Sequence, residues 1–174
     1  MNRMTLKQKL LGTVVVFAAL SATQANAQSS SNLTVTASVP SACIINAAGT
    51  DTVLAFNLAG LTSAVADFTA SADFAWQCSL GTAMTISISP GGSTDQLNRA
   101  MTGPAGSLAY NLHTDATYAT IWGDGTAPTS TVDPTGLGIN VVGISQIFGR
   151  ILLADAQAAG AGNYNDIVVV TLLP

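Results

Sequence analysis

The alternation of apolar and polar residues from Phe68 to Cys78 constrains the fold of this chain more than any other feature. Apolar side chains occupy every second position, and mostly polar residues stand between them. Successive side chains of an extended strand point to opposite faces, so a period of two gathers the apolar set on one face. We therefore expect a strand with a buried face made of Phe68, Ala70, Ala72, Phe74, Trp76 and Cys78.

Several other segments have strand character. The alternation recurs in Thr82–Ser89, where we expect Met84, Ile86 and Ile88 to face inward. Turn-rich stretches of Gly, Pro, Asn and Asp separate the segments, and Ala-rich Leu152–Ala159 could form a short helix. The pattern predicts a single antiparallel β-sandwich domain. The remaining predicted strands are Leu33–Val39, Val53–Leu58, Leu108–Leu112, Tyr118–Trp122, Ile139–Phe148 and Ile167–Leu173.

Charge supports an all-β fold and excludes two classes of partner. All nine acidic residues are Asp, and only five residues are basic, so the strong helix formers Glu, Lys and Arg are scarce. Three of the five basic residues lie within the first nine positions. Without them, two arginines face nine aspartates, a formal charge of −7. Such a chain binds neither the phosphates of nucleic acid nor anionic lipid through its charge.

The N-terminus predicts a secretion signal at residues 1–27. A basic start precedes the apolar run Leu10–Leu20, and Ala25-Asn26-Ala27 provides the small residues at which signal peptidase cleaves. A membrane anchor is the alternative, but the run is shorter than the roughly 20 residues that span a bilayer. The mature chain then begins at Gln28.

Export also predicts that the two cysteines form a disulfide. Cys43 and Cys78 both lie in the mature part, and an oxidising compartment favours their pairing. Two free thiols or a metal pair are the alternatives, but His113 is the only histidine, which leaves a zinc site short of ligands. We predict a Cys43–Cys78 disulfide.

The sequence lacks the residue combinations typical of enzymes. His113 and Asp115 would share a face of a strand, as a base and its orienting carboxylate do, but a lone histidine near a loop is far more often a surface residue. Asp124 and the run Asn163–Asp166 could hold calcium, yet turn formation explains them as well. We predict a protein that is not an enzyme and has no catalytic residues, cofactor or metal.

Motifs spread over nearly the whole mature chain carry a family resemblance. An alternating segment leads to Cys43, and Trp76-Gln77-Cys78 ends the longest predicted strand. Further motifs follow in Leu108–Asp115, Ile121–Gly125, Ile147–Ile151 and Gly162–Leu172. In this order, and with the signal peptide, the chain resembles the spore coat protein U domain family, which includes pilin subunits of archaic, Csu-type chaperone–usher pili.

The resemblance implies an incomplete immunoglobulin-like sandwich completed by a donor strand from a neighbouring subunit. The chain then divides into the signal peptide at 1–27, a donor-strand segment at 28–39 and a pilin domain at 40–174. The residues alone favour a different reading, in which 32–39 is an ordinary first strand that pairs in its own sheet. The donor residues are Leu33, Val35, Ala37 and Val39, and the C-terminal strand contains Ile167, Val168, Val169, Val170 and Leu172.

The function implied is that of a structural subunit of an extracellular pilus that serves surface attachment and biofilm formation. Its partners would be identical or homologous subunits joined head to tail, a periplasmic chaperone and an outer-membrane usher, and it would pass through the periplasm to the cell surface. One alternative is a secreted spore-coat or envelope protein that does not polymerise. Another is a secreted carbohydrate-binding module, for which Trp122 would be the available aromatic residue.

Overall fold

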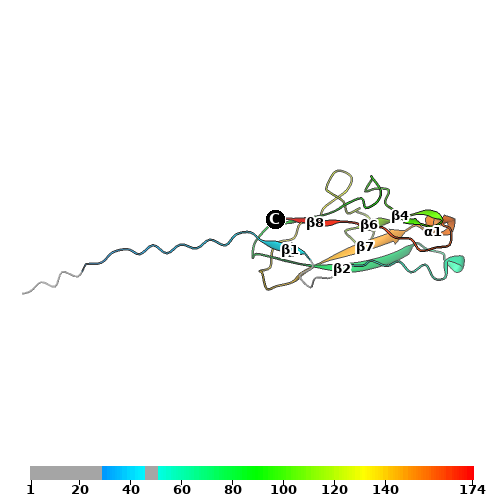
Figure 1. Cartoon of the computed structure of the whole chain (residues 1–174). Coiled ribbons are helices and arrows are strands. Elements are labelled where there is room, and N and C mark those ends of the chain that lie inside the picture. Colours follow the sequence, from blue (N-terminus) through cyan, green and yellow to red (C-terminus); the bar gives the residue numbers. More distant parts are fainter. Residues whose placement is uncertain (1–28, 46–50) are drawn as a thin grey trace, which may run out of the picture. The chain divides into compact units, whose positions relative to one another are not determined.

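The computed structural model describes residues 29–45 and 51–174 (Figure 1). The predicted signal peptide lies outside the described residues. The described residues 29–37 belong to one unit, and the described residues from Ser38 to Pro174 form a second. Residues 29–37 have no regular secondary structure, and the side chains of Leu33 and Val35 are 87% and 81% exposed. The strand expected from Leu33 to Val39 is therefore not formed.

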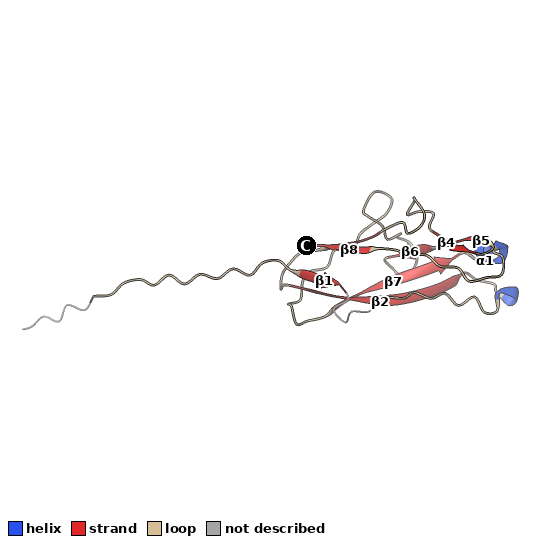
Figure 2. Cartoon of the chain, in the orientation of Figure 1, coloured by secondary structure: helices blue, strands red, loops and turns tan. Residues whose placement is uncertain are grey.

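The second unit is built mainly from antiparallel β-structure (Figure 2). Its largest sheet has four strands in the order β1-β2-β7-β6, and every neighbouring pair is antiparallel. The long central strands pair from Phe68 with Ile151 to Trp76 with Gly143. The four strands are β1 (Cys43–Ile45), β2 (Phe68–Cys78), β7 (Gly143–Ile151) and β6 (Asn111–His113).

Two shorter strand pairs and two helical turns complete the unit. Strand β3 (Thr85–Ile88) pairs with the C-terminal strand β8 (Val170–Leu173), and β4 (Ala100–Gly103) pairs with β5 (Gly106–Ala109). The 3-10 turn η1 spans Leu61–Ser63, and helix α1 spans Leu153–Ala158. In the part of the chain that the structure describes, no helix is long and apolar enough to cross a membrane.

The core combines side chains from the four-stranded sheet and from the shorter pairs. Trp76 of β2 lies against Gly143, where an added Cβ would approach the indole to 2.2 Å, so only glycine fits there. The Trp76 indole N–H donates to Ser145 Oγ at 3.0 Å, which satisfies the buried polar group. The core further contains Phe74, Met84, Ile86, Ile88, Leu108, Leu112, Trp122, Ile147 and Ile151.

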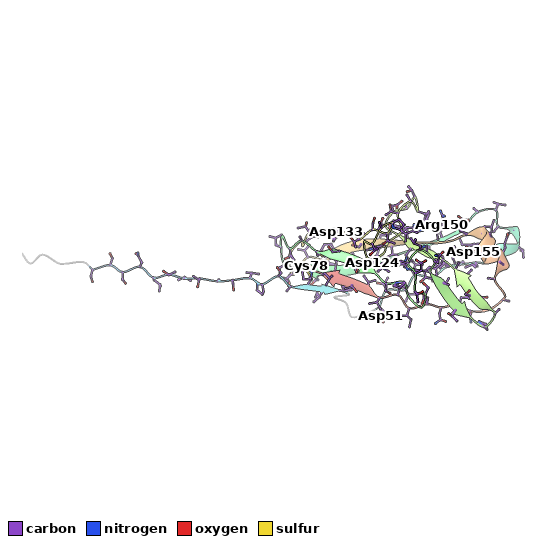
Figure 3. The ribbon with its side chains drawn as sticks, turned by 90° about the horizontal axis from the view of Figure 1, so that it is seen from above. Asp51, Cys78, Asp124, Asp133, Arg150 and Asp155 are labelled. Atoms are coloured by element: carbon purple, nitrogen blue, oxygen red, sulfur yellow. A yellow bond between two sulfur atoms is a disulfide. The ribbon has the colours of Figure 1, made fainter. Side chains whose placement is uncertain are left out.

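The predicted disulfide is present between β1 and β2. Cys43 and Cys78 face one another in the antiparallel register, and their sulfur atoms are bonded. Figure 3 shows Cys78 beside β1, at the end of β2. The bridge thus fixes the first strand of the domain to the longest one.

Two expectations about single side chains are wrong. Trp122 is fully buried, and its indole N–H donates to the Ile86 carbonyl at 2.9 Å, so it is not available to a sugar. His113 is 5% exposed and belongs to the edge strand β6, so it is not a surface residue. Segment 121–122 forms isolated bridges beside His113, and the local sequence does not reveal the burial of either residue.

Several strand boundaries also differ from the prediction. The C-terminal strand begins at Val170, so Ile167, Val168 and Val169 precede it. Tyr118–Trp122 forms only isolated bridges, from Ile121 to His113 and from Trp122 to Ser130. Leu108–Leu112 is divided at Tyr110 between β5 and β6, and Val53–Leu58 is not a strand. Strand β4 was not expected, because Ala100–Gly103 has a weak apolar alternation.

Candidate functional site

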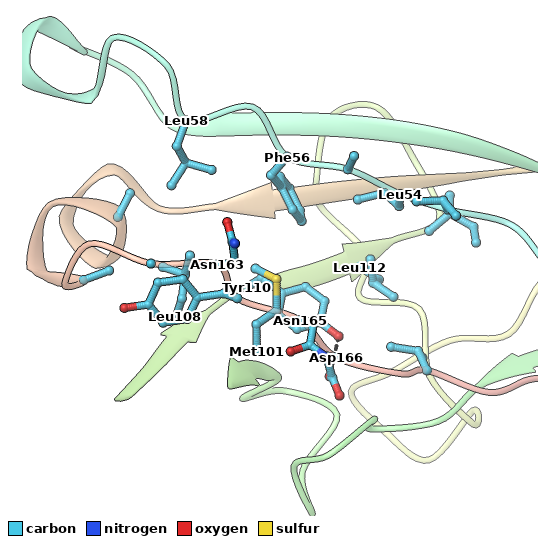
Figure 4. A pocket seen from close by; sticks show the side chains of 18 of the residues that line it. Leu54, Phe56, Leu58, Met101, Leu108, Tyr110, Leu112, Asn163, Asn165 and Asp166 are labelled. Carbon is cyan, nitrogen blue, oxygen red and sulfur yellow. Dashed lines mark hydrogen bonds between the residues drawn. The ribbon is translucent and has the colours of Figure 1, made fainter. Parts of the chain in front are cut away.

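An apolar groove of about 790 Å³ opens along the second unit (Figure 4). One rim is the extended segment 52–58, and the other is the segment 163–170 that leads into β8. In the close-up, Leu54, Phe56 and Leu58 lie on one side, and Asn163, Asn165 and Asp166 lie opposite. The floor is part of the hydrophobic core and includes Ile88, Met101, Leu108, Tyr110, Leu112 and Ile147.

The first rim is an extended segment whose backbone has no partner among the residues that the structure describes. Its side chains alternate, so that Leu54, Phe56 and Leu58 are half-buried while Val53 is exposed. Leu54 and Phe56 pack over Gly149 of β7, where a Cβ would come within 3.0 Å of both side chains. Among the described residues, no backbone–backbone hydrogen bond involves residues 52–57. Their N–H and C=O groups are therefore free to pair with another strand.

The second rim is paired on one side only. Thr102 and Asn165 exchange two backbone hydrogen bonds of 2.9 and 3.0 Å, and Ser89 N–H donates to the Val169 carbonyl at 2.9 Å. The backbone of Val168, which lines the groove, has no hydrogen-bond partner within the described ranges. Both rims thus present unpaired backbone to the same apolar space, as the edge strands of an interrupted sheet do.

A hydrogen-bond network joins the floor to the second rim. Tyr110 Oη donates to Asp166 Oδ2 at 2.7 Å, and Gly92 N–H donates to Asp166 Oδ1 at 2.8 Å. Burial raises the pKa of the Tyr110 phenol, and the Asp166 carboxylate raises it further, so Tyr110 remains a donor. The network holds the rim against the Gly91-Gly92 turn.

Arg99 lies fully buried behind this network. Its guanidinium donates to the carbonyls of Ser89 and Trp122, at 3.0 and 2.8 Å, and to Asn111 Oδ1 at 2.8 Å. Burial lowers the pKa of Arg99, but an arginine remains charged because its ordinary pKa is above 12. Arg99 therefore connects the β3–β4 loop, β6 and Trp122 through carbonyl contacts, as a structural group.

The side chains of His113 and Asp115, considered as a base and its orienting carboxylate, do not hydrogen-bond to each other. Asp115 accepts hydrogen bonds from the backbone of Thr117 and Thr120, and contacts the Thr117 hydroxyl closely. The Thr117 hydroxyl and these backbone donors lower the pKa of Asp115 to about 2. His113 Nδ1 is buried and has no hydrogen-bond partner among the described residues, and the ring packs against Tyr118. Burial, followed by the charge of Arg150, lowers the pKa of His113.

In the loops considered for calcium, the aspartate side chains already accept hydrogen bonds from other groups of the protein. Asp124 accepts from Thr126 N–H at 2.8 Å, a turn contact, and Asp166 is engaged by Tyr110 and Gly92. Within residues 29–45 and 51–174, no group of three or more His, Cys, Asp or Glu side chains could hold a metal ion.

The predicted site residues fall into two places. Leu33 and Val35 are exposed in the first unit, and Val39 is exposed at the start of the second. Val168 and Val170 line the groove, Leu172 packs against the core, and Ile167 and Val169 face outward. Sequence reasoning missed the first rim and the floor, although the alternation of Leu54, Phe56 and Leu58 is visible in the sequence.

Comparison with known proteins places the chain in a family. No curated protein matches it significantly. A similar solved chain comes from the "Crystal structure of CsuC-CsuE chaperone-tip adhesion subunit pre-assembly complex from archaic chaperone-usher Csu pili of Acinetobacter baumannii", with 20% identity and a TM-score of 0.47. That match covers 77% of the present chain and 40% of the other. The family model for the Spore Coat Protein U domain matches residues 29–171, and the chain belongs to this family.

Proposed function

We propose that this protein is a structural subunit of an extracellular pilus, assembled by donor-strand exchange. In this assembly, residues 32–39 of one copy fill the groove of the next, and the incomplete sandwich becomes a complete immunoglobulin-like one. The observation that carries the proposal is the groove itself, an apolar space between two backbone edges that, in the described part of the chain, have no partner on the groove side. Strand addition to such an edge is an established mode of recognition.

The N-terminal segment has the properties that this groove requires. Leu33, Val35, Ala37 and Val39 alternate with polar residues, so one face of an inserted strand would enter the apolar floor. Eight strand residues extend over about 26 Å, at about 3.3 Å per residue. The second rim, 163–170, is an extended segment of the same number of residues, so an inserted strand can pair along all of it.

The expected burial is large enough to control the stability of the subunit. Burying Leu33, Val35 and Val39 contributes about 1.5–3 kcal/mol each, or roughly 5–9 kcal/mol before the cost of ordering the segment. A whole domain is stable by only about 5–15 kcal/mol. A subunit with an empty groove should therefore need a protective partner. This need supports the two partners that the family resemblance implies, a periplasmic chaperone and an outer-membrane usher. The subunit would reach them by export through the predicted signal peptide.

A matched pair of substitutions in the donor segment tests the proposal. Val35→Asp places a charge on the face that would enter the groove, whereas Thr36→Asp places one on the opposite face. Each variant is expressed with the chaperone and usher genes of its source, and fibres are counted by electron microscopy. We expect Val35→Asp to abolish fibres while the chaperone-bound subunit accumulates normally, and Thr36→Asp to assemble.

Three results would contradict the proposal. Deletion of Gln28–Val39 could leave a stable monomer with unchanged melting behaviour, or Val35→Asp could polymerise as well as Thr36→Asp. Wild-type protein that remains a secreted monomer would support the alternative, a spore-coat or envelope component that does not polymerise. The carbohydrate-binding alternative is weakened, because Trp76 and Trp122 are both buried and neither can stack on a sugar.

A further inference from the structure

The floor of the groove contains a methionine, Met101. It belongs to β4 and faces Leu108 of β5 in the antiparallel register, and its side chain lines the groove. In the close-up this side chain points into the groove and carries its sulfur atom there (Figure 4). Met101 packs against the core but is only half-buried, because the groove leaves one side of it open. A small molecule in solution can therefore reach the thioether.

The predicted mature chain contains one other methionine, and that residue is enclosed. Only Met84 and Met101 follow Gln28 in the sequence. Met84 is 3% exposed, and its Sδ lies 3.3 Å from Sγ of Cys78, beside the disulfide. The two thioethers thus have the same chemistry and opposite accessibility, so each serves as the reference for the other.

An accessible thioether reacts with peroxides. The sulfur donates an electron pair to one oxygen of hydrogen peroxide, an S–O bond forms and the O–O bond breaks. The second oxygen takes the proton of the transferred one and leaves as water, so the sulfur loses two electrons and the peroxide gains them. Cys43 and Cys78 are bonded to each other, so neither offers a thiol that would consume the oxidant first.

The sulfoxide would place a polar oxygen on an apolar floor. The side chains of Leu108, Leu112 and Ile147, which line the same space, have no hydrogen-bond donor. The Tyr110 hydroxyl in the floor already donates to Asp166. Because burying a polar group without a hydrogen bond is unfavourable, the oxidised groove should remain open to water instead of closing over an apolar strand.

We propose that Met101 is an oxidation site that controls the groove, which accepts an apolar strand when the side chain is a thioether and rejects it when a peroxide has made the sulfoxide. Methionine sulfoxide is reduced by dedicated reductases, so the change is reversible. A strand in the groove would cover Met101, and subunits not yet assembled would therefore be the ones that react. The selectivity for Met101 follows from its exposure alone, whereas its effect on strand insertion rests on the proposed donor-strand exchange.

The first experiment measures oxidation at the two methionines. The mature chain, Gln28–Pro174, is treated with hydrogen peroxide in the absence of chaperone, then unfolded and digested with trypsin. Arg99 and Arg150 are the only arginine or lysine residues after Gln28, so Met84 and Met101 fall into separate peptides, 28–99 and 100–150. Peptide 100–150 should gain one oxygen, about 16 Da, at least about tenfold faster than peptide 28–99. Equal rates, as expected for the chain unfolded in urea, would overturn the site.

The second experiment measures the binding of a synthetic peptide of Asn32–Val39 before and after peroxide treatment. Met84→Leu retains Met101, and its affinity for the peptide should fall at least about tenfold on oxidation. Met101→Leu has no thioether in the groove, so its affinity, whatever its value, should be the same before and after treatment. Leucine nearly conserves the volume of methionine, so both variants should fold. Sulfoxide reductases for both epimers should restore binding to oxidised Met84→Leu.

The outcomes separate this inference from the proposed function. Equal peptide affinity of untreated and oxidised Met84→Leu would overturn control by Met101 and leave donor-strand exchange intact. A similar loss of affinity in oxidised Met101→Leu would also overturn it, because another residue would then be responsible. Failure of the peptide to bind the untreated wild-type chain would instead overturn donor-strand exchange, while the peptide masses would still report whether Met101 is the oxidised residue.

Discussion

The Tyr110 hydroxyl donates a 2.7 Å hydrogen bond to Asp166 Oδ2, and this contact joins the groove floor to its second rim. Because the acceptor is a carboxylate and the phenol is buried, the bond belongs to the stronger class of protein hydrogen bonds. It also positions Asp166 to accept from Gly92 N–H. The rim is therefore held from two directions.

Tyr110→Phe should destabilise the subunit by about 1.5–3 kcal/mol, the usual range for a hydrogen bond to a charged group. The ring still packs in the floor, so the loss reports the hydroxyl alone. Urea titration of the purified protein measures the change. Tyr164→Phe is the matched control, because its hydroxyl donates to the carbonyl of Gly160 only four residues away, a local and neutral contact. Equal losses in the two variants would argue against a special role for Asp166.

Arg99→Met should cost at least about 3 kcal/mol, because it leaves several buried acceptors without a donor. The carbonyls of Ser89 and Trp122 lose their Arg99 donor, and the amide oxygen of Asn111 keeps only the Leu112 N–H. Arg99→Lys should recover part of the loss, since an ammonium offers three donors but not the planar fork. Denaturant unfolding of both variants gives the order of stability, and a lysine variant no better than methionine would contradict this account.

Stability should depend on pH through His113. Burial lowers its pKa below the ordinary value of 6.5, so the unfolded chain takes up a proton first as the pH falls. The Arg150 guanidinium acts in the same direction, whereas Asp115 opposes it. The contribution of His113 to the free energy of unfolding is therefore fully present above about pH 6.5, and it is lost as the pH falls toward the pKa of the folded state.

His113→Phe provides the comparison for this pH effect. A phenyl ring can keep the edge contact with Tyr118, and it removes the proton site and the unpartnered Nδ1. Urea midpoints measured between about pH 7.5 and 5 should decline for the wild type and stay nearly constant for the variant. Parallel curves would show that His113 does not carry the dependence.

The disulfide should account for a sizeable part of the stability. Closing a loop of 35 residues stabilises a protein by roughly 3–4 kcal/mol when the effect is treated as chain entropy. Titration of the denatured, unreduced protein should find essentially no free thiol. Replacing Cys43 and Cys78 together should lower the free energy of unfolding by about 2–5 kcal/mol. Two titratable thiols, or a dimer split by reductant, would disprove an intramolecular bridge.

A self-complemented chain should be stable without a chaperone. In this variant a flexible linker and a copy of Asn32–Val39 follow Pro174, and Gln28–Val39 are removed from the N-terminus. If the groove accepts the segment, the chain should be a monomer that melts at a higher temperature than the unmodified subunit and forms no fibres. Size-exclusion chromatography and thermal unfolding check both properties, and a copy carrying Val35→Asp is the control.

The parts of the fold that the sequence predicts well are those with a long local signal. The alternation from Phe68 to Cys78 predicts β2 with the correct bounds, because one face of the strand is half-buried from Phe68 and fully buried from Phe74 to Cys78. The pairing of Cys43 with Cys78 follows from their being the only cysteines. The first prediction is local, and the second needs only the number of cysteines and the predicted export, although the two residues are 35 positions apart.

The groove and the buried loop residues have no such local signal. Segments 52–58 and 163–170 are separated by most of the domain, and the groove exists because no strand lies between them. Trp122 is buried against β3, where the Ile86 carbonyl, 36 residues earlier, accepts from its indole. Periodicity describes which side of a segment is apolar, but not which distant segment covers it.

The bond between Cys43 and Cys78 has a mechanical consequence. Tension applied to the N-terminal segment reaches the domain at Ser79, whose hydroxyl donates to the Pro40 carbonyl, and then at Cys43, and the sulfur–sulfur link passes it covalently to the end of β2. Pulling cannot peel β1 from its neighbour, nor extend the chain between the two cysteines, without breaking a covalent bond. The load instead bypasses residues 44–77 and enters the rest of the domain at Cys78, the end of the strand that pairs with β7. A domain connected in this way resists unravelling from the end at which it is pulled.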